Sequence, residues 1–148
     1  MERTLKGEPA MKVEGQCHCG AITYEADVKV GTIGICHCLD CQTLTGSAFR
    51  VHIPAPADTF HVLTGAPKRY VKTADNGVQR VHAFCDQCGA PVYSCAKDNP
   101  PFYSLRVGAL RQRNELGDPH RQIWTERRLS WVPRIAEIPE ITHIRGQP

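Results

Sequence analysis

Seven of the eight cysteines lie in three short clusters, and this spacing constrains the fold more than any other feature of the sequence. The clusters are CxC, CxCxxC and CxxC, formed by Cys17 and Cys19, by Cys36, Cys38 and Cys41, and by Cys85 and Cys88. Cysteines separated by one residue are poorly placed to form a disulfide with each other, whereas both thiolates can turn toward one metal ion. The spacing therefore predicts thiolate sites for zinc.

The N-terminal residues carry no signal that would direct the chain out of the cell. The stretch MERTLKGEPAMKVEG lacks the apolar segment and the small-residue cleavage site of a secretory signal. No apolar run approaches the length of a membrane span. We therefore expect a cytoplasmic protein, in which clustered thiols stay reduced and act as metal ligands. A redox dithiol at Cys38 and Cys41 or at Cys85 and Cys88 is the alternative, but it would not explain the two CxC pairs.

Length and charge favour a single globular domain without a nucleic-acid surface. The 148 residues fit one domain, and the hydrophobic and charged fractions of 41% and 22% are those of an ordinary soluble protein. The formal net charge of +3 falls to zero if seven thiolates bind two zinc ions. Because no long run of like charges occurs, binding to a phosphate backbone has little support.

Alternating apolar and polar residues predict a mainly antiparallel β fold. The expected strand regions are residues 21–28, 48–53, 69–84, 102–110 and 121–127. Asn76-Gly77 lies between two β-prone runs and predicts a hairpin. In the fourth region we expect every second side chain from Tyr103 to Ala109 to face inward. Residues 39–46 could form a short turn of helix, and helical periodicity is weak elsewhere.

The first and third clusters together, called the four-cysteine cluster below, supply the ligands of a closed zinc site. Cys17 and Cys19 come from one turn, and Cys85 and Cys88 come from the far side of the domain. A glycine follows each pair and permits the tight turn of a zinc knuckle. Such sites contribute on the order of 10–16 kcal/mol of apparent binding free energy to folding, which outweighs the stability of a small domain. We therefore interpret this site as structural.

The middle cluster, called the three-cysteine cluster below, leaves two interpretations open. It consists of Cys36, Cys38 and Cys41, and a closed site of four results if Cys95 completes it. Cys95 stands alone in VYSCAKD, however, and a lone cysteine is more often a small buried apolar residue. His37 lies between two ligands, so its side chain is expected to point away from the metal. Spacing alone does not decide between a closed and an open site.

Four motifs in this order resemble the family of glutathione-dependent formaldehyde-activating enzymes, whose relatives include a centromere protein. They are GQCHCGAITYE, CHCLDCQTLTGSAF, FCDQCGAPVY and IWTERRLSWV. The resemblance runs from about residue 13 to about residue 138. It divides the chain into an N-terminal extension, residues 1–12, and a single domain, residues 13–148. The implied fold is β-rich, contains zinc, and is like that of the Mss4 group.

The resemblance also implies different roles for the two clusters. It implies a structural zinc in the four-cysteine cluster and a second zinc, with an available fourth position, in the three-cysteine cluster. It thus favours the open site over the closed one. The implied activity is that of a carbon–sulfur lyase, which forms or cleaves the S-hydroxymethyl adduct of glutathione and formaldehyde. The implied partner is glutathione or another small thiol.

The chemistry of three thiolates suits such an open site. They bring a zinc ion to a net charge of −1, so a bound water is acidified less than at a site of three neutral histidines. A soft, thiolate-rich zinc favours a fourth sulfur ligand and would hold a substrate thiol as its thiolate. Cys36, Cys38 and Cys41 are therefore the candidate catalytic residues. Two alternatives stay open: a carrier that binds a thiol without accelerating its reaction, and a zinc-stabilised module that only binds partners.

A tripeptide thiol with two carboxylates needs cationic or backbone anchors. Arg50 lies one short strand beyond the three-cysteine cluster. Gly46 and Ser47 lie between them, in a turn that could offer backbone N–H groups. These three are the candidate substrate-binding residues. For the other cations considered we expect solvated strand faces: Lys68, Arg69, Arg80 and Arg106.

Five further side chains are assigned to positioning, proton transfer or packing. Asp40 and Gln42 flank the last cysteine of the three-cysteine cluster and are expected to orient the ligand loop. His52 lies on the same predicted strand face as the candidate arginine and is a candidate proton carrier. Trp124 and Trp131 are expected to pack in the core or at a sheet edge.

Overall fold

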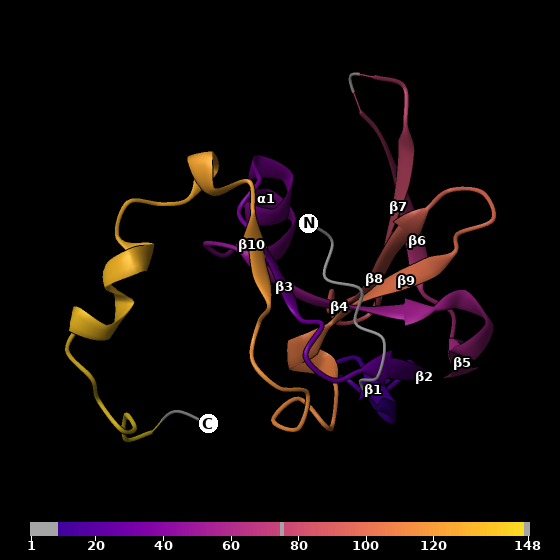
Figure 1. Cartoon of the computed structure of the whole chain (residues 1–148). Helices are drawn as coiled ribbons and strands as arrows, with labels where there is room; N and C mark the ends of the chain where they lie inside the picture. Colours follow the sequence, from indigo (N-terminus) through magenta and orange to yellow (C-terminus); the bar gives the residue numbers. More distant parts are fainter. Residues whose placement is uncertain (1–8, 75, 147–148) are drawn as a thin grey trace.

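The computed structural model describes residues 9–74 and 76–146, which form two β-sheets (Figure 1). The three-stranded sheet has the order β1-β2-β5. Its strands are β1 (Ala10–Gln16), β2 (Thr23–Lys29) and β5 (His61–Thr64). The seven-stranded sheet has the order β10-β3-β4-β9-β8-β7-β6. Its strands are β3 (Gly34–Cys36), β4 (Arg50–Pro56), β6 (Lys68–Thr73), β7 (Gln79–Phe84), β8 (Pro91–Ala96), β9 (Phe102–Arg106) and β10 (Arg121–Ile123).

Helices make up a small part of the described residues. The α-helix α1 (Leu39–Thr45) follows β3 and agrees with the short helical turn expected at 39–46. The remaining helices are short 3₁₀ segments: η1 (Ala57–Thr59), η2 (Val107–Ala109), η3 (Thr125–Arg127) and η4 (Val132–Glu137). No helix in the described ranges combines the length and the hydropathy needed to cross a membrane. The predicted mainly β fold is confirmed.

β1 and β2 form an antiparallel pair that contributes one wall of the core. The two strands pair over their whole length, and β5 adds to the outer side of β2. Every second side chain of β2 is buried: Tyr24, Ala26 and Val28. This is the burial pattern of a strand with one face on the core, as predicted for 21–28.

The predicted hairpin forms at one edge of the large sheet. β6 and β7 pair antiparallel along six residues each, and Gly77 in their connection has a left-handed φ of 84°. At the opposite edge β10 runs parallel to β3, an exception that the alternation patterns did not predict. β3 and β10 are far apart in the sequence, so no hairpin sets their relative direction, and the connection 110–120 brings β10 to the edge beside β3.

Two expected strands are shorter than predicted. β9 ends at Arg106, because Val107–Ala109 form η2. Leu105 is buried as expected, but Arg106 on the opposite face is buried too, since β9 lies between β4 and β8 in the middle of the sheet. In the last expected strand only Arg121–Ile123 pair with a neighbour, because Trp124 takes a left-handed conformation at the start of η3.

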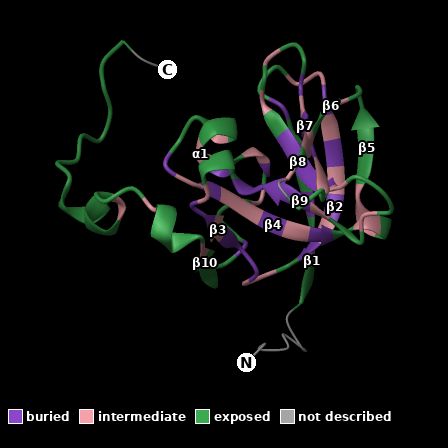
Figure 2. Cartoon of the chain, turned by 90° about the horizontal axis from the view of Figure 1, so that it is seen from above, coloured by how far each residue is buried: buried purple, intermediate pink, exposed green. Residues whose placement is uncertain are grey.

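The core contains side chains from both sheets. β2 packs against β4, and Ile53 of β4 and Leu105 of β9 are fully buried. Phe60 stacks on Tyr103 with ring centroids 4.5 Å apart and meets the edge of Tyr93 at 5.3 Å. Figure 2 shows the buried residues concentrated on the strands of both sheets. The strands can be short because the inner faces of both sheets contribute to one shared core.

The segment after η3 contributes little to this core. The described residues from 129 onward are mostly exposed, and they lie apart from the sheets in both views of the chain (Figures 1 and 2). Trp124 and Trp131 are 56% and 42% exposed. The expectation that both indoles pack in the core or at a sheet edge is therefore not confirmed.

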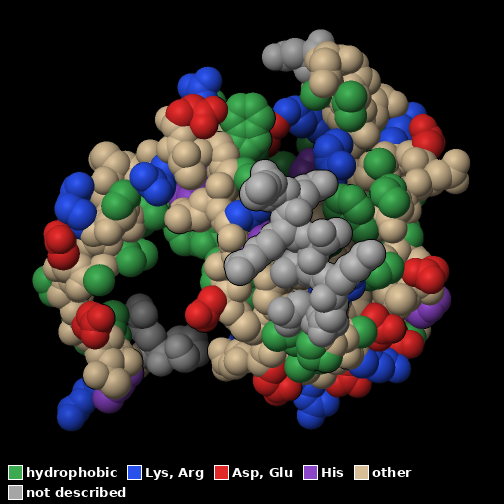
Figure 3. Space-filling view, viewed as in Figure 1, with side chains coloured by type: hydrophobic (Ala, Val, Ile, Leu, Met, Phe, Trp, Pro, Cys, Tyr) green, Lys and Arg blue, Asp and Glu red, His purple; other side chains and the backbone are tan. Residues whose placement is uncertain are grey.

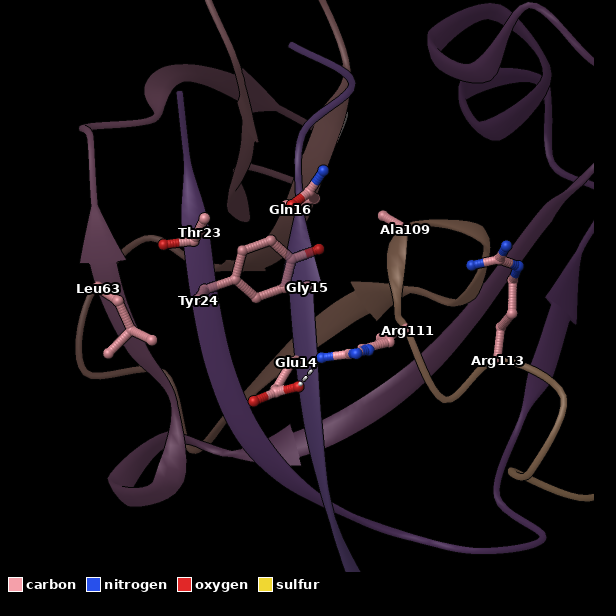
Figure 4. Close-up of a pocket in the computed structure, with 9 residues that line it drawn as sticks. All are labelled: Glu14, Gly15, Gln16, Thr23, Tyr24, Leu63, Ala109, Arg111 and Arg113. Atoms are coloured by element: carbon pink, nitrogen blue, oxygen red, sulfur yellow. Dashed lines mark hydrogen bonds and ion pairs between the residues drawn. The ribbon is translucent and has the colours of Figure 1, made fainter. Parts of the chain in front are cut away.

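Gly15 in β1 leaves room for the ring of Tyr24, which lies opposite it in β2. Gly15 is buried, and a Cβ atom at this position would overlap the ring and hydroxyl of Tyr24. Figure 4 shows the two residues beside a cavity of about 510 Å³ that Glu14, Leu63 and Arg111 also line. A close approach of this kind explains why a glycine occupies a strand position.

Gly15→Ala is expected to lower the free energy of unfolding by about 1–3 kcal/mol, because the added methyl group overpacks the space that Tyr24 fills. Gly108→Ala is the matched control, since a Cβ there meets no atom within 4 Å. Urea unfolding followed by circular dichroism measures both differences. Equal losses in the two variants would contradict the packing of Tyr24 against Gly15.

Candidate metal centre

The four-cysteine cluster joins one turn of each sheet. Cys17 and Cys19 lie between β1 and β2, and Cys85 and Cys88 lie between β7 and β8. Their sulfur atoms all lie within 4.8 Å of one another, with 3.6 Å between Cys17 and Cys19 and 3.7 Å between Cys19 and Cys85. A tetrahedral zinc site with Zn–S bonds of about 2.3 Å places its sulfurs about 3.8 Å apart. The four thiols therefore fit full thiolate coordination of one metal ion.

The two turns that carry this cluster share a hydrogen-bond pattern. In each turn the N–H of the first cysteine donates to the carbonyl five residues later, and the N–H of the glycine donates to the carbonyl of the first cysteine. Gly20 and Gly89 have left-handed φ values of 82° and 78°. Ile22 N–H also donates to Sγ of Cys17 at 3.2 Å, which stabilises a thiolate there. The glycine after each pair therefore has the role that the sequence predicted.

The three-cysteine cluster lies at the junction of β3 and α1. Cys36 ends β3, Cys38 is the N-cap of α1, and Cys41 lies in its first turn. The three sulfurs lie within 4.8 Å of one another, and Sγ of Cys38 accepts a hydrogen bond from the N–H of Cys41 at 3.3 Å. Among the described residues no fourth cysteine, histidine or carboxylate joins this group. The fold thus assembles three thiols that could hold a metal ion.

Neither Cys95 nor His37 completes the three-cysteine cluster. Cys95 is 1% exposed and packs in the core from β8, as expected of a small apolar residue. His37 is fully buried, and its Nε2 lies 2.8 Å from Oε1 of Gln122. Its ring also meets the edge of Phe49, with centroids 5.5 Å apart. The interpretation of two closed sites with four cysteines each is therefore wrong for the described chain.

Residues 122–127 hold the loop that carries the three-cysteine cluster. The N–H of His37 donates to the carbonyl of Ile123 at 3.1 Å. The side-chain amide of Gln42 donates to the carbonyls of His37 and Arg127 at 2.8 and 2.9 Å. Gln42 therefore orients the ligand loop, as predicted. The contribution of Gln122 and Arg127 was missed, because nothing in the local sequence indicates that this distant segment reaches the loop.

The three-cysteine cluster opens into a cleft of about 760 Å³. Four cationic side chains line the cleft: Arg50, Lys72, Arg80 and Arg121. In the described part of its wall Asp40 carries the only carboxylate, which forms an ion pair with Lys72 of β6. On the face of the molecule seen in Figure 3, by contrast, basic and acidic side chains are intermixed. The cleft is thus a place where positive charge is in excess beside the thiols.

Arg50 is the cation most closely coupled to the cluster. It lies in β4 opposite Cys36 of β3 and is 7% exposed. Burial raises the pKa of the Cys41 thiol in the protein without metal, and the positive charge of Arg50 opposes this rise. The Nε of Arg50 is buried without a hydrogen-bond partner, and none of the three ion pairs among the described residues involves it. Its charge is therefore available to an anion in the cleft.

The four other cations considered from the sequence as anchors differ in their exposure. Lys68 and Arg69 are exposed on β6, as predicted, and Arg80 is half-buried in the wall of the cleft. Arg106 is 7% exposed, so the predicted solvated position is wrong for this residue. The reason is its place on the central strand of the large sheet, on a face that the end of α1 and the strands β6 and β7 enclose.

The comparison with known proteins agrees with this arrangement of cysteines. A model of the protein family described as glutathione-dependent formaldehyde-activating enzyme matches residues 12–127. The chain belongs to this family. Among solved structures, the crystal structure of a Rhodobacter sphaeroides protein from structural genomics is similar, with a TM-score of 0.57 and 24% identity over 74% of this chain and 98% of that chain. The second similarity concerns the fold, which is the Mss4-like fold that the sequence predicted.

Gly46 and Ser47, the other predicted substrate contacts of this family member, lie at the C-terminal end of α1. Gly46 has a left-handed φ of 62° and its N–H donates to the carbonyl of Thr43 at 3.3 Å. The N–H of Ser47 donates to the carbonyl of Gln42 at 3.3 Å. Both residues are exposed, and neither lines the cleft. Their N–H groups thus serve to end the helix.

Two half-buried histidines line the cleft, His52 in β4 and His82 in β7. Gly34, opposite His52 in β3, leaves room for its ring. Burial lowers the pKa of His52 to about 4, and the charges of Arg106 and Arg50 add to this effect. Burial followed by the same two charges also lowers the pKa of His82 to about 4. Both imidazoles are therefore neutral near pH 7 and can accept a proton.

Cys85→Ser is expected to unfold the protein, because it removes a buried ligand from the cluster that joins the two sheets. Cys38→Ser is expected to keep the fold and to lose metal from the three-cysteine cluster alone. Zinc content per chain and circular dichroism measure both outcomes, and Cys95→Ser is the control with full metal content. A stable, metal-replete Cys85→Ser protein would contradict the structural role of the four-cysteine cluster.

The ring-proton resonances of His52 and His82 are expected to stay fixed between about pH 7.5 and 5.5, since their pKa values lie near 4. The unfolded chain binds protons on histidine below about pH 6.5. Stability therefore falls as the pH is lowered from about 6.5 toward 4, where the unfolded state binds more protons than the folded one. An NMR titration, with His52→Gln and His82→Gln used for assignment, measures the pKa values. A midpoint near 6.5 for either ring would contradict its burial beside the arginines.

Proposed function

We propose that the protein is a zinc-dependent carbon–sulfur lyase that forms or cleaves the bond between a small thiol, such as glutathione, and formaldehyde. One observation carries the proposal: three thiols without a fourth ligand in the described chain open into a cleft lined by four cations. A site that only holds a fold would need neither the open position nor the positively charged cleft. Membership of the glutathione-dependent formaldehyde-activating enzyme family supports the same reaction.

In this proposal each cysteine cluster holds one zinc ion. The four-cysteine cluster holds the structural ion, which fits its complete set of ligands and its position between the sheets. The catalytic ligands are Cys36, Cys38 and Cys41. When bound there, zinc supplies a soft Lewis acid that keeps the sulfur of a substrate thiol deprotonated and nucleophilic. The hydrogen bond from the N–H of Cys41 and the contacts of His37 and Gln42 fix the positions of the ligands.

The cations of the cleft select a thiol that also carries negative charge. Glutathione has two carboxylates, and a cleft with four cations and a single, already paired carboxylate favours such an anion. Arg50 is the anchor closest to the thiols in the strand register, and its guanidinium can bind a carboxylate through two parallel hydrogen bonds. The N–H groups of Gly46 and Ser47 donate within the chain, so the proposal does not rely on them. Their contacts with a substrate stay a prediction.

The reaction needs one proton to move from the thiol to the oxygen of formaldehyde. In the direction of addition the sulfur forms a bond to the carbonyl carbon, and the π electrons move to the oxygen, which then takes up the proton. The reverse direction breaks the same C–S bond and returns the proton to sulfur. His52 and His82 line the cleft as neutral imidazoles. Because a pKa near 4 makes them weak bases near pH 7, their role in the proposal is to donate an N–H hydrogen bond to the oxygen as its charge develops.

Calorimetric titration of glutathione into the zinc-loaded protein tests this proposal, with Cys95→Ser as the matched control. Saturable binding is expected in both proteins and is expected to be lost in Cys38→Ser. Arg50→Gln is expected to raise the dissociation constant about tenfold or more, because it removes a charge-assisted hydrogen bond. Turnover of formaldehyde is then measured by the disappearance of the free aldehyde.

The outcomes separate the alternatives for this site. Binding together with turnover supports the lyase. Binding without turnover in the presence of formaldehyde would contradict the lyase and indicate a thiol carrier. Binding only in Cys95→Ser would contradict the open position at the three-cysteine cluster. Absence of binding in both proteins would rule out glutathione and indicate another thiol or a protein partner.

A further inference from the structure

A second cavity shares Arg50 with the cleft of the thiols. Its volume is about 340 Å³, and it lies between the end of α1 and the strands β6 and β7. Its wall includes Leu44, Arg50, Lys68, Arg69, His82 and Arg106. No aspartate or glutamate is among the described residues that line it. Arg50 and His82 belong to both walls, so this cavity adjoins the cleft of the three-cysteine cluster.

Two arginines of this cavity are buried and form no ion pair with a carboxylate. Arg50 and Arg106 are each 7% exposed, and the Nε atom of each is buried without a hydrogen-bond partner, while Nη1 of Arg106 donates to the carbonyl of Ser104 at 3.1 Å. Neither takes part in any of the three ion pairs found in residues 9–74 and 76–146. A buried charge is costly unless an opposite charge or hydrogen bonds compensate it. This structure therefore places two guanidinium groups where an anion is needed.

The two guanidinium groups also act on each other. Burial lowers the pKa of Arg106 to about 9, and the nearby charge of Arg50 adds to the effect. Arg106 is still a cation near pH 7, so the two positive charges repel each other. The Cys41 thiolate offsets part of both positive charges, but of the two arginines only Arg50 lines the cleft of the thiols. The remaining charge faces the second cavity, together with the exposed Lys68.

We propose that the second cavity is an anion site that binds a small oxyanion, a carboxylate or a phosphate group, between Arg50, Arg106 and Lys68. The planar fork of each arginine matches the oxygens of such a group through paired hydrogen bonds. The small volume excludes a large ligand, although it accepts the end of one that continues into the cleft. The site does not depend on the proposed lyase activity, because none of the three cysteines lines it.

Inorganic phosphate is the probe for this site, because it carries the required oxygens and no thiol. It is titrated by calorimetry at constant ionic strength into Cys38→Ser protein, which lacks a complete three-cysteine cluster, so that phosphate on that metal is excluded. Saturable binding is expected. Lys68→Gln is expected to raise the dissociation constant about tenfold or more, since its charge-assisted contact is lost. Lys68 is exposed, so the variant retains the fold.

The matched control is Lys29→Gln, which removes the same charge from an exposed position outside the cavity. It is expected to bind phosphate like the parent protein. Absence of saturable binding, or equal weakening in Lys68→Gln and Lys29→Gln, would overturn the proposal. Equal weakening would show that phosphate responds only to net charge. As a second variant, Arg106→Lys keeps the charge but removes the fork and is expected to weaken binding.

Competition with glutathione in the wild type identifies the source of the oxyanion. If the substrate places a carboxylate in the cavity, glutathione displaces phosphate, and Cys38→Ser weakens this displacement. If a separate anion occupies the site, phosphate and glutathione bind together. Either result supports the site. A protein that fails to bind glutathione would contradict the proposed function, yet the phosphate titration of Cys38→Ser would still test the anion site.

Discussion

The four-cysteine cluster is the constraint on which the rest of the structure depends. It joins the turn between β1 and β2 to the turn between β7 and β8, and thereby fixes the small sheet against the large one. The strands are short, and β5 and β6 present mostly exposed residues, so packing alone provides limited stability. Ligand binding energy on the order of 10 kcal/mol can offset this deficit. The core therefore forms around a site that has no part in the proposed chemistry.

With the sheets held in this way, one face of the large sheet can carry polar groups. His52 of β4 pairs with Arg106 of β9, and Ser104 of β9 pairs with Ser94 of β8, which pairs with His82 of β7. These side chains lie on one face of four neighbouring strands and line the two cavities. The same burial that lowers the pKa of both histidines leaves the Nε atoms of Arg50 and Arg106 without hydrogen-bond partners. The electrostatic properties of the site thus follow from the burial of these residues on the central strands of the sheet.

The parts of this arrangement that are local in sequence could be predicted. Cysteine spacing indicated both clusters, and Asn76-Gly77 indicated the hairpin, because the relevant geometry lies within a few residues. The parallel pairing of β10 and the burial of Arg106 depend on contacts between distant segments, and no local pattern encodes them. The same holds for the contact of Gln122 with His37. Alternation identified the strands but not which polar face would be covered.

The family match ends at the last described residue that contacts the loop of the three-cysteine cluster. The match covers residues 12–127, and Arg127 provides the carbonyl that accepts the second hydrogen bond from Gln42. Every described contact that orients the three-cysteine loop therefore lies inside the matched region. Beyond it, the described residues are mostly exposed and lie apart from the sheets. The segment that forms the three-cysteine site thus ends at η3, because the last residue that contacts the ligand loop lies there.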